Sequence, residues 1–421
     1  MRRISESPSE ARTAKRRFPA ILPVGIAALL AASFIGSAGM GARQTFGLFV
    51  EPLSIEAGIS ITTIALAIAI HNLVWGFAQP FAGAAADRYG PGPVVAVGAG
   101  FLFAGLALAA IAPSSVGLIL GIGILFGIGI SCTSFGVVLT AVGKLALPEK
   151  RSTAMGLASA GGSLGQVLLV PVTQNVLYGW GPGTAFFALA VLALLVAPLG
   201  YLLIARTGTE APVPIEPSIS TRTAVTQALG HDGFCLLTFG FFTCGFQLAF
   251  VVTHLPTYLN LCGMAPSAGA LALALIGLFN MVGSWGCGWL GGRYRQRAVL
   301  AVLYALRGVV IIAFFLAPKS QASIIGFSAA MGLMWLGTVP LTTGIVARIF
   351  GVRHLGTLFG ICFLSHQIGS FAGSWLGGVV LQSTGGYGPI WIATAASGFL
   401  AAVLHLAIRD EAAPSGLAPA Q

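Results

Sequence analysis

The sequence predicts an all-α membrane protein with about twelve transmembrane helices in two six-helix halves. Composition is the first sign, because charged residues make up 8% of the chain and hydrophobic residues 56%, whereas soluble domains carry about 25% charged residues. Apolar runs long enough to cross a bilayer follow one another along the chain. A short motif after the second run returns in weaker form half a chain later, which indicates an internal repeat.

The repeated motif is Gly83-Ala-Ala-Ala-Asp87-Arg88-Tyr89-Gly90, and its weaker copy is Gly288-Trp-Leu-Gly-Gly292-Arg293-Tyr294. In both copies an apolar run leads into small residues, a basic residue and an aromatic residue. Small residues let two helices approach closely, and the charges that follow must lie in water. Each copy therefore predicts a tight turn between two membrane helices on the basic side of the membrane. A short solvated turn without a further role is the simpler alternative.

The N-terminal residues 1–19 are polar and basic and predict a cytoplasmic tail. A cleavable signal peptide is the alternative, but the apolar run from Ala20 is long enough to span a membrane and further spans follow. Lipid offers backbone groups no hydrogen-bond partners, so each span is predicted to be a helix. The predicted spans are residues 20–48, 60–84, 94–112, 117–142, 153–177, 183–205, 233–258, 266–290, 298–317, 322–347, 356–381 and 387–407.

The loops between these spans carry their basic residues on one side only. By alternation, that side holds Arg88, Lys144, Lys150, Arg151, Arg206, Arg222, Arg293, Arg295, Arg297, Arg348, Arg353 and Arg409. The other side holds Lys319, with Glu51 and Glu56. Cytoplasmic loops are enriched in Lys and Arg. The pattern therefore predicts an integral protein of the inner (plasma) membrane with both termini in the cytoplasm.

The longest loop, residues 206–231, is rich in Pro, Thr and Ser and predicts a flexible cytoplasmic linker. It divides the chain into an N-terminal half, 20–205, and a C-terminal half, 232–408, followed by a cytoplasmic tail at 409–421. A net charge of +10 would normally favour a nucleic-acid partner. Here the basic residues are topology signals in short loops, so no nucleic-acid partner is expected.

Two six-helix halves joined by a central loop resemble the major facilitator superfamily. The first motif matches that superfamily's loop signature at Gly83, Asp87, Arg88 and Gly90, although prolines follow where basic residues usually stand. The resemblance implies two parallel halves around a midplane site, and a monomer. It also implies a cytoplasmic gate in which Asp87 and Arg88 contact neighbouring helix ends. In the weaker copy Arg293 is retained and would belong to the same gate.

Two arginines, Arg43 and Arg307, fall inside predicted spans. An arginine at membrane depth is costly and by default marks a cavity or a partner. Arg43 could instead extend to the outer surface, and Arg307 could bond helix carbonyls. No carboxylate is predicted near the midplane, so the two guanidinium groups lack an obvious counter-ion. An anionic substrate would supply that charge, and guanidinium grips a carboxylate through two parallel hydrogen bonds.

Proton coupling needs a group that titrates near neutral pH, and His71, His254 and His366 are the candidates inside the spans. Each could equally be a hydrogen-bonded packing residue. His366 stands out because it lies in the polar run Ser365-His366-Gln367. Asn280 and Tyr304, one turn before Arg307, are further candidates for lining a substrate site.

The chain also resembles the monocarboxylate porter family and its bacterial relatives. In the first span that family has a basic residue, a small polar one, a Phe-containing stretch and an acidic residue, which here is Arg43-Gln44-Thr45-Phe46-Gly47-Leu48-Phe49-Val50-Glu51. In the eighth span the family has Asp-Met-Val-Ala-Arg and then a Gly. Here the run is Asn280-Met281-Val282-Gly283-Ser284 followed by Gly288. The family's Asp/Arg pair is thus absent, and Arg307 or Arg43 would have to take over carboxylate binding.

These features together predict a secondary active transporter of small organic anions, monocarboxylates first, working by alternating access with or without coupling to protons. Arg43, Asn280, Tyr304, Arg307 and His366 are the predicted substrate-binding residues, and His71 and His366 the predicted proton carriers. An exporter of amphipathic or drug-like compounds is the alternative, since the Phe-rich spans allow it. A non-transporting membrane sensor is a third hypothesis, but it would be expected to carry a large soluble domain, and the sequence predicts none. No enzyme motif, metal cluster or cofactor site is visible.

Overall fold

The computed structural model describes residues 26–145, 151–203, 220–351 and 354–409. These residues form long helices and contain no strand, which confirms the predicted fold class. The elements of the N-terminal half are α1 (Ile26–Thr45), η1 (Phe46–Phe49), α2 (Val50–Glu56), α3 (Ile61–Tyr89), α4 (Pro91–Ile111), α5 (Ser115–Leu118), η2 (Ile119–Leu125), α6 (Phe126–Thr133), α7 (Phe135–Leu145), α8 (Arg151–Leu195) and η4 (Ala197–Leu203).

The C-terminal half follows a short helix, α9 (Thr221–Leu229). Its elements are α10 (Asp232–Leu261), α11 (Pro266–Arg293), α12 (Gln296–Leu316), α13 (Gln321–Leu333), α14 (Thr338–Phe350), α15 (Leu355–Thr384) and α16 (Gly388–Ala407). Eleven described segments are long and apolar enough to cross a membrane. One of them, Ala154–Leu203, is 50 residues long. Gly181 divides it into two, because its φ of 78° is not helical and Pro182 follows, so the number of crossings agrees with the prediction.

Glycine and serine set the ends of the helices where the chain must turn. Gly90 ends α3 with a φ of 84°, a conformation that L side chains disfavour, and Pro91 then opens α4. At the other end of α3, the Ser60 hydroxyl accepts a hydrogen bond from the Thr63 amide at 3.2 Å. Such caps satisfy amides that have no partner inside the helix. The motif Gly83 to Gly90 is therefore the last two turns of a helix followed by a tight reversal.

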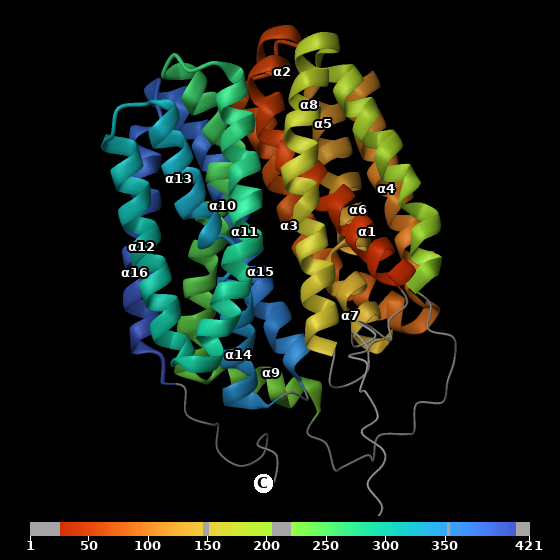
Figure 1. Cartoon of the computed structure of the whole chain (residues 1–421), viewed down its shortest axis with the longest axis vertical. Helices are drawn as coiled ribbons and strands as arrows, with labels where there is room; N and C mark the ends of the chain where they lie inside the picture. Colours follow the sequence, from red (N-terminus) through yellow and green to blue (C-terminus); the bar gives the residue numbers. More distant parts are fainter. Residues whose placement is uncertain (1–25, 146–150, 204–219, 352–353, 410–421) are drawn as a thin grey trace, which may run out of the picture.

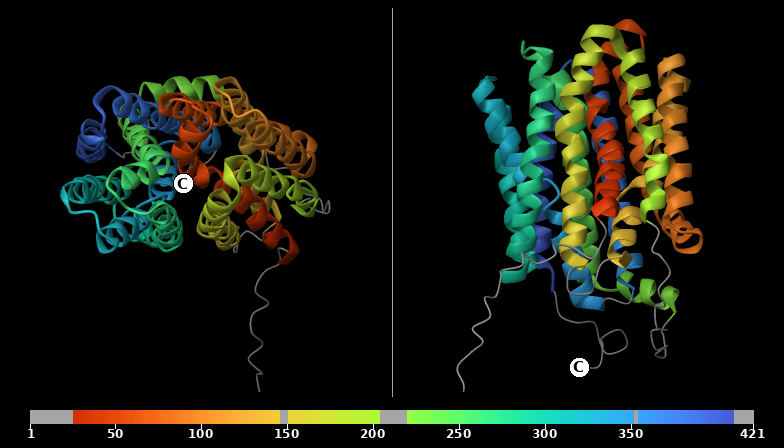
Figure 2. Two further views of the ribbon diagram at one scale, coloured as in Figure 1. Left: turned by 90° about the horizontal axis from the view of Figure 1, so that it is seen from above. Right: turned by 45° about the vertical axis from the view of Figure 1, so that its right-hand side comes forward.

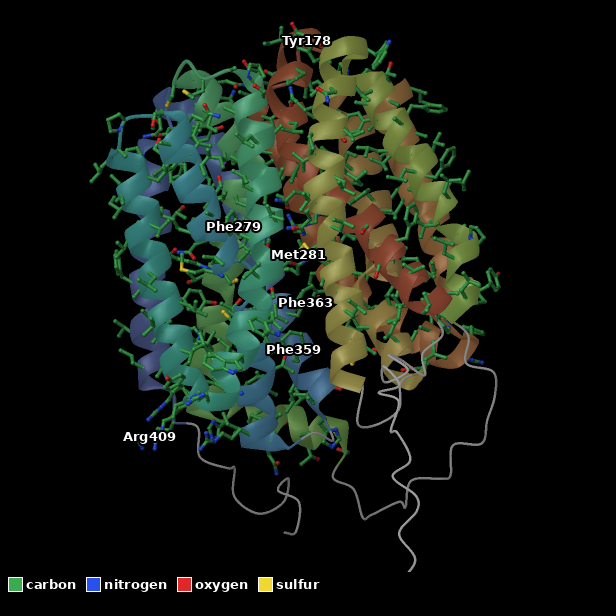
Figure 3. The ribbon with its side chains drawn as sticks, in the orientation of Figure 1. Tyr178, Phe279, Met281, Phe359, Phe363 and Arg409 are labelled. Atoms are coloured by element: carbon green, nitrogen blue, oxygen red, sulfur yellow. The ribbon has the colours of Figure 1, made fainter. Side chains whose placement is uncertain are left out.

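The helices are grouped in two bundles that lie side by side (Figures 1 and 2). Red to yellow-green helices form the N-terminal half and green to blue helices the C-terminal half. The halves touch mainly where α3 packs along α15 and where α8 packs along α11. We call the end that carries Arg88, Arg293 and Arg409 the basic end; Figure 3 shows Arg409 there and Tyr178 at the opposite end.

The predicted linker departs from expectation in its last part. Residues 204–219 lie outside the described residues, but residues 221–229 form helix α9 rather than irregular chain. The Ser220 hydroxyl caps this helix by accepting a hydrogen bond from the Thr223 amide at 3.2 Å. A helix of this length is marginal alone, and α9 packs against α10 and α15. The predicted tails at 1–19 and beyond Arg409 also lie outside the described residues.

Within the described residues, the hydrogen bonds between the two halves lie at the opposite end and at mid-depth. At the opposite end the Thr62 hydroxyl donates to the Gly378 carbonyl at 3.1 Å, and the Asn260 amide donates to the Glu51 carboxylate. At mid-depth the Asn280 amide donates to the Ser163 hydroxyl at 3.3 Å. These contacts tie α2 and α3 to α15 and α10, and α8 to α11.

Glycines on α3, α8, α11 and α15 show that the halves separate toward the basic end. A methyl group at Gly76 of α3 would lie 2.8 Å from the Gln367 side chain, but two turns later a methyl group at Gly83 would meet nothing within 4 Å. The same change occurs on the facing helices, where Gly156 of α8, Gly288 of α11 and Gly360 of α15 also have open space. The structure is therefore open toward its basic end.

Candidate functional site

The side chain of Arg43 lies at mid-depth where α1 approaches α3. Its Nη2 atom donates to the Asn72 Oδ1 atom at 3.1 Å, and its Cζ atom lies 5.5 Å from the centre of the Trp75 ring. The residue is half-buried, and its Nε atom has no partner among the described residues. Arg43 is thus held by neutral groups, one amide and one aromatic face, and keeps donors to offer.

Trp75 fixes this arrangement and connects it to the other half. Its indole N–H donates to Gln79 Oε1 at 2.8 Å and reaches Ser134 Oγ at 3.3 Å. The ring of Phe363, on α15, packs edge-on against it with centroids 5.3 Å apart. Figure 3 shows Phe363 between the two halves. The Arg43 group therefore belongs to the N-terminal half but lies beside the face where the two halves meet.

A substrate anchor must be able to contact a bound molecule, but Arg307 lies buried inside the C-terminal half. Its side chain is 0% exposed. Its Nη2 atom donates to the Trp335 carbonyl at 2.6 Å and also to the Met334 carbonyl, and Nη1 donates to the Cys244 thiol at 3.3 Å. This matches the alternative in which Arg307 bonds helix carbonyls. A buried group contacts no bound molecule in this conformation, and a binding role for Arg307 stays a prediction.

The carbonyls that Arg307 binds are free because the tenth span is broken. We expected one helix over 322–347, but α13 ends at Leu333 and α14 begins at Thr338. Four residues of turn separate them, including Gly337, and Pro340 follows in the first turn of α14. Helix ends leave carbonyls without partners, and Arg307 supplies the donors. The Gly337 and Pro340 pair was the sequence signal for this break.

Asn280 and Tyr304 are both buried among partners. The Asn280 Oδ1 atom accepts from the Leu336 amide and from the Ser284 hydroxyl, each at 3.1 Å, so it supports the same break. Tyr304 stacks on the His405 ring at 4.7 Å and lies under the Arg307 guanidinium at 5.4 Å. Asn280 is thus an interface residue between the halves, and Tyr304 packs inside the C-terminal half.

The three candidate histidines differ in what their ring nitrogens do. His254 has both nitrogens engaged, Nδ1 with the Tyr387 hydroxyl at 2.9 Å and Nε2 with the Ser374 carbonyl at 2.7 Å. His71 binds the Ile68 carbonyl at 2.6 Å through Nδ1 and is packed between Phe46 and Phe126. His366 is 8% exposed, and its Nδ1 atom lies 3.0 Å from Gln367 Oε1. Both nitrogens of His254 are thus engaged in packing contacts, whereas the Nε2 atom of His71 has no partner among the described residues. The side chain of His366 also interacts with Cys244.

The residues of the predicted gate all lie at the basic end. Asp87 pairs with Lys144 at the end of α7 at 2.8 Å, and both side chains are more than half exposed. Arg88 lies over the neighbouring Tyr89 ring and Arg293 over Trp289. Within the part of the chain that the structure describes, these contacts stay inside each half. A gate would close only when the halves approach at this end.

Replacing Asp87 by Asn tests whether the pair with Lys144 acts in transport. An exposed ion pair contributes about 0–1 kcal/mol to stability, so the melting temperature should stay within a few degrees. If the pair positions the gate, the uptake rate should fall by roughly fivefold for each ~1 kcal/mol lost. The swap Asp87→Lys with Lys144→Asp should restore it. An unchanged uptake rate in Asp87→Asn would mean that the motif is only a solvated turn.

A family model described as "Major Facilitator Superfamily" matches residues 26–339 and 287–421 of this chain. The chain belongs to the Major Facilitator Superfamily. Members of this superfamily are transporters. The protein is therefore a transporter rather than an enzyme. The prediction of two six-helix halves and the resemblance stated from the loop motif are both confirmed.

Relatives of this protein include transporters of organic acids. The monocarboxylate transporter 13 of Bos taurus is 26% identical over 362 residues, covering 85% of this chain and 83% of the relative. The oxalate:formate antiporter of Oxalobacter formigenes is 22% identical over 377 residues, with 86% of each chain covered. The uncharacterized MFS-type transporter YcxA of Bacillus subtilis is 25% identical over 373 residues, covering 84% of this chain and 88% of that one.

Solved structures agree on the fold. A bacterial homolog of the human lysosomal transporter Spinster, crystallised in an inward-facing and unoccupied conformation, superposes with a TM-score of 0.73 at 16% identity, covering 92% of this chain and 98% of that one. A D-xylose-proton symporter superposes with a TM-score of 0.67 at 16% identity, covering 93% and 99%. At this identity the likeness concerns the arrangement of helices alone.

Proposed function

We propose that this protein is a secondary active transporter of small organic anions, monocarboxylates first, that works by alternating access. The observation that carries the proposal is the Arg43 guanidinium. It lies at mid-depth beside the interface of the halves, is only half-buried, and is held by the Asn72 amide and the Trp75 ring. A cation supported by neutral groups can bind an anion without first breaking an ion pair.

The distribution of carboxylates supports an anionic substrate. The described carboxylates are Glu51, Glu56, Asp87 and Asp232, and each lies at or near the end of a membrane span. None of the described carboxylates lies within salt-bridge distance of Arg43. A charge at membrane depth is costly without a partner. A substrate carboxylate would supply the missing charge and would lower that cost when it binds.

The conformation supports alternating access around this point. If the basic end faces the cytoplasm, as the positive-inside rule predicts, the structure is inward-open. Contacts such as Glu51 with Asn260 then close the outer side. Rocking the two halves about mid-depth would open that side and bring the basic ends of α3, α8, α11 and α15 together. We place the protein in the inner (plasma) membrane with cytoplasmic termini, acting as a monomer.

The names of relatives support the proposed substrate class. The names of two of them refer to monocarboxylates and to oxalate and formate, all of which are small organic anions. This chain has a basic residue, Arg43, in the first span as the porter family does, but it has Asn280 and Ser284 where that family's eighth span has an Asp/Arg pair. We therefore assign the carboxylate anchor to Arg43 alone. Arg307 lies too deep in the C-terminal half to share this role in the present conformation.

The test is exchange of labelled carboxylates in proteoliposomes, with each acid paired with its neutral amide. The panel would run from formate and lactate to phenyl-substituted acids. We expect at least one acid to exchange well above empty liposomes, while its amide does not. Equal exchange of an acid and its amide would reject the anion site. It would favour the exporter of amphipathic compounds, for which the apolar side chains of Met281, Phe359 and Phe363 between the halves would form the walls (Figure 3).

A further inference from the structure

A chain of polar contacts leads from Arg43 across the interface into the C-terminal half. Asn72, which accepts from Arg43 through its side chain, uses its backbone carbonyl to accept from the Gln367 amide at 3.1 Å. The Gln367 Oε1 atom then lies 3.0 Å from His366 Nδ1. The contact joins residues 295 positions apart in the sequence. The candidate anion site is therefore connected to a histidine of the other half through one amide.

These contacts fix which nitrogen of His366 carries its proton. A backbone carbonyl only accepts hydrogen bonds, so the atom of Gln367 that faces Asn72 is its NH₂ group. The other amide atom is then the oxygen, which also only accepts. His366 must therefore donate to it from Nδ1, and Nε2 is left with its lone pair. The neutral imidazole thus offers Nε2 as a base.

The other side of His366 faces a buried thiol. Helices α10 and α15 are in close contact here, because a methyl group at Gly245, the residue after Cys244, would lie 1.8 Å from the His366 carbonyl oxygen. Cys244 interacts with the His366 side chain, and its sulfur lies 3.3 Å from Thr338 Oγ1. Its sulfur also accepts from Arg307 Nη1 at 3.3 Å. Four helices, α10, α12, α14 and α15, thus bring Cys244, Arg307, Thr338 and His366 together in the core of the C-terminal half. This cluster was not visible from the sequence.

The cluster contains groups that can balance the positive charge of Arg307. Its other described partners are two backbone carbonyls, which carry no net charge. Buried charges in proteins are paired or neutralised. The thiol accepts a hydrogen bond from the guanidinium, the Tyr304 phenol ring lies under the same guanidinium, and the imidazole beside the thiol is the base. A proton can therefore reside on the sulfur or on His366 Nε2.

The phenol of Tyr304, on α12, is a further titratable group that interacts with Cys244, and Cys287, on α11, interacts with Arg307. Two histidines and two arginines of the packed helices point away from the pair. From α3, His71 is turned into the N-terminal half between two phenylalanines. From α16, His405 stacks on Tyr304 and binds the Ala401 carbonyl through Nδ1. The ring of Phe363, one turn before His366 on the side of the opening, stacks parallel to it at 6.0 Å. The basic groups of α9 and α14, Arg222 and Arg348, lie toward the basic end.

We propose that the Cys244–His366 pair, beside Arg307, is the site that binds and releases a transported proton. This inference rests on the proposed anion transport and adds its coupling mechanism. A proton from the water of the opening adds to the lone pair of Nε2 or to the thiolate sulfur, and no other bond changes. The added positive charge favours an anion at Arg43, to which the pair is linked through Gln367 and Asn72. By reciprocity the bound anion favours the proton, so the two move together.

The test separates exchange from gradient-driven accumulation. The wild type, His366→Gln, Cys244→Ala and Cys362→Ala are compared in proteoliposomes with an acid from the panel that exchanges. Cys362 is the matched control, because it is another buried thiol whose described side-chain contact is with Thr238. We expect the wild type and Cys362→Ala to exchange and to accumulate the acid under an inward proton gradient. For His366→Gln and Cys244→Ala we expect accumulation, divided by each variant's own exchange rate, to be at least about tenfold lower than for the wild type.

Proton uptake on substrate binding provides a second measurement that does not need a sealed vesicle. Adding the acid to the wild type in weakly buffered detergent should take up protons, and adding it to His366→Gln should not. Accumulation or proton uptake by His366→Gln at the wild-type level would overturn the proposal, as would a wild type that exchanges the acid but ignores the gradient. Absence of exchange by the wild type would reject the anion-transport proposal itself, and the coupling with it.

Discussion

The Gly369→Ala variant is expected to lose at least about 2 kcal/mol of stability, which would lower its melting temperature by several degrees. Helices α10 and α15 touch closely at several glycines. A methyl group at Gly369 would lie 2.0 Å from the Phe242 carbonyl oxygen, and one at Gly373 would lie 2.1 Å from the Phe246 oxygen. A carbon and an oxygen need more than 3 Å, so the helix backbones would have to move apart.

Gly360→Ala is the matched control for this prediction. It lies on the same helix, but a methyl group there would meet nothing within 4 Å. Alanine is a better helix former than glycine by about 1 kcal/mol, so the control should melt at the same temperature or slightly higher. Thermal unfolding of purified protein in detergent would measure both. Equal melting temperatures for the two variants would show that α10 and α15 are not packed as closely as described.

The topology could be predicted because lipid restricts the choices. The lengths of apolar runs, the sidedness of the basic loops and the repeated motif each follow from the energy of placing charges and backbone groups in a membrane. These three features predicted the membrane crossings correctly, including the chain reversals at Gly90 and at Gly181. The same rules pointed to Arg43 and Arg307 as costly residues, but they do not say where the side chains point.

The partners of those arginines could not be predicted, because they come from distant parts of the chain. Arg307 is held by carbonyls at a helix break 27 residues away, and local signals alone did not locate that break. The contact between Asn72 and Gln367 depends on how the two halves dock. Helix α9 was missed for a related reason, since tertiary packing stabilises a segment whose polar composition favours irregular chain.

The Arg43→Gln variant is expected to raise the half-saturation concentration for anion exchange by about 10- to 100-fold. A hydrogen bond to a charged group contributes roughly 1.5–3 kcal/mol, and each 1.4 kcal/mol corresponds to a factor of ten. Glutamine keeps a donor for Asn72 but removes the charge and the fork of N–H groups. Arg43→Lys should fall between the two, because it keeps the charge without the planar fork.

Arg88→Gln is the matched control, because Arg88 also lies over an aromatic ring, with its Cζ atom 5.2 Å from the centre of Tyr89 compared with 5.5 Å for Arg43 and Trp75. Arg88 lies at the basic end, far from the mid-depth site. Its loss could change the rate of exchange but should leave the half-saturation concentration unchanged. If Arg43→Gln retained wild-type affinity, or if both variants weakened affinity equally, Arg43 would not be the anion anchor. The general positive potential of the protein would then have to explain any preference for anions.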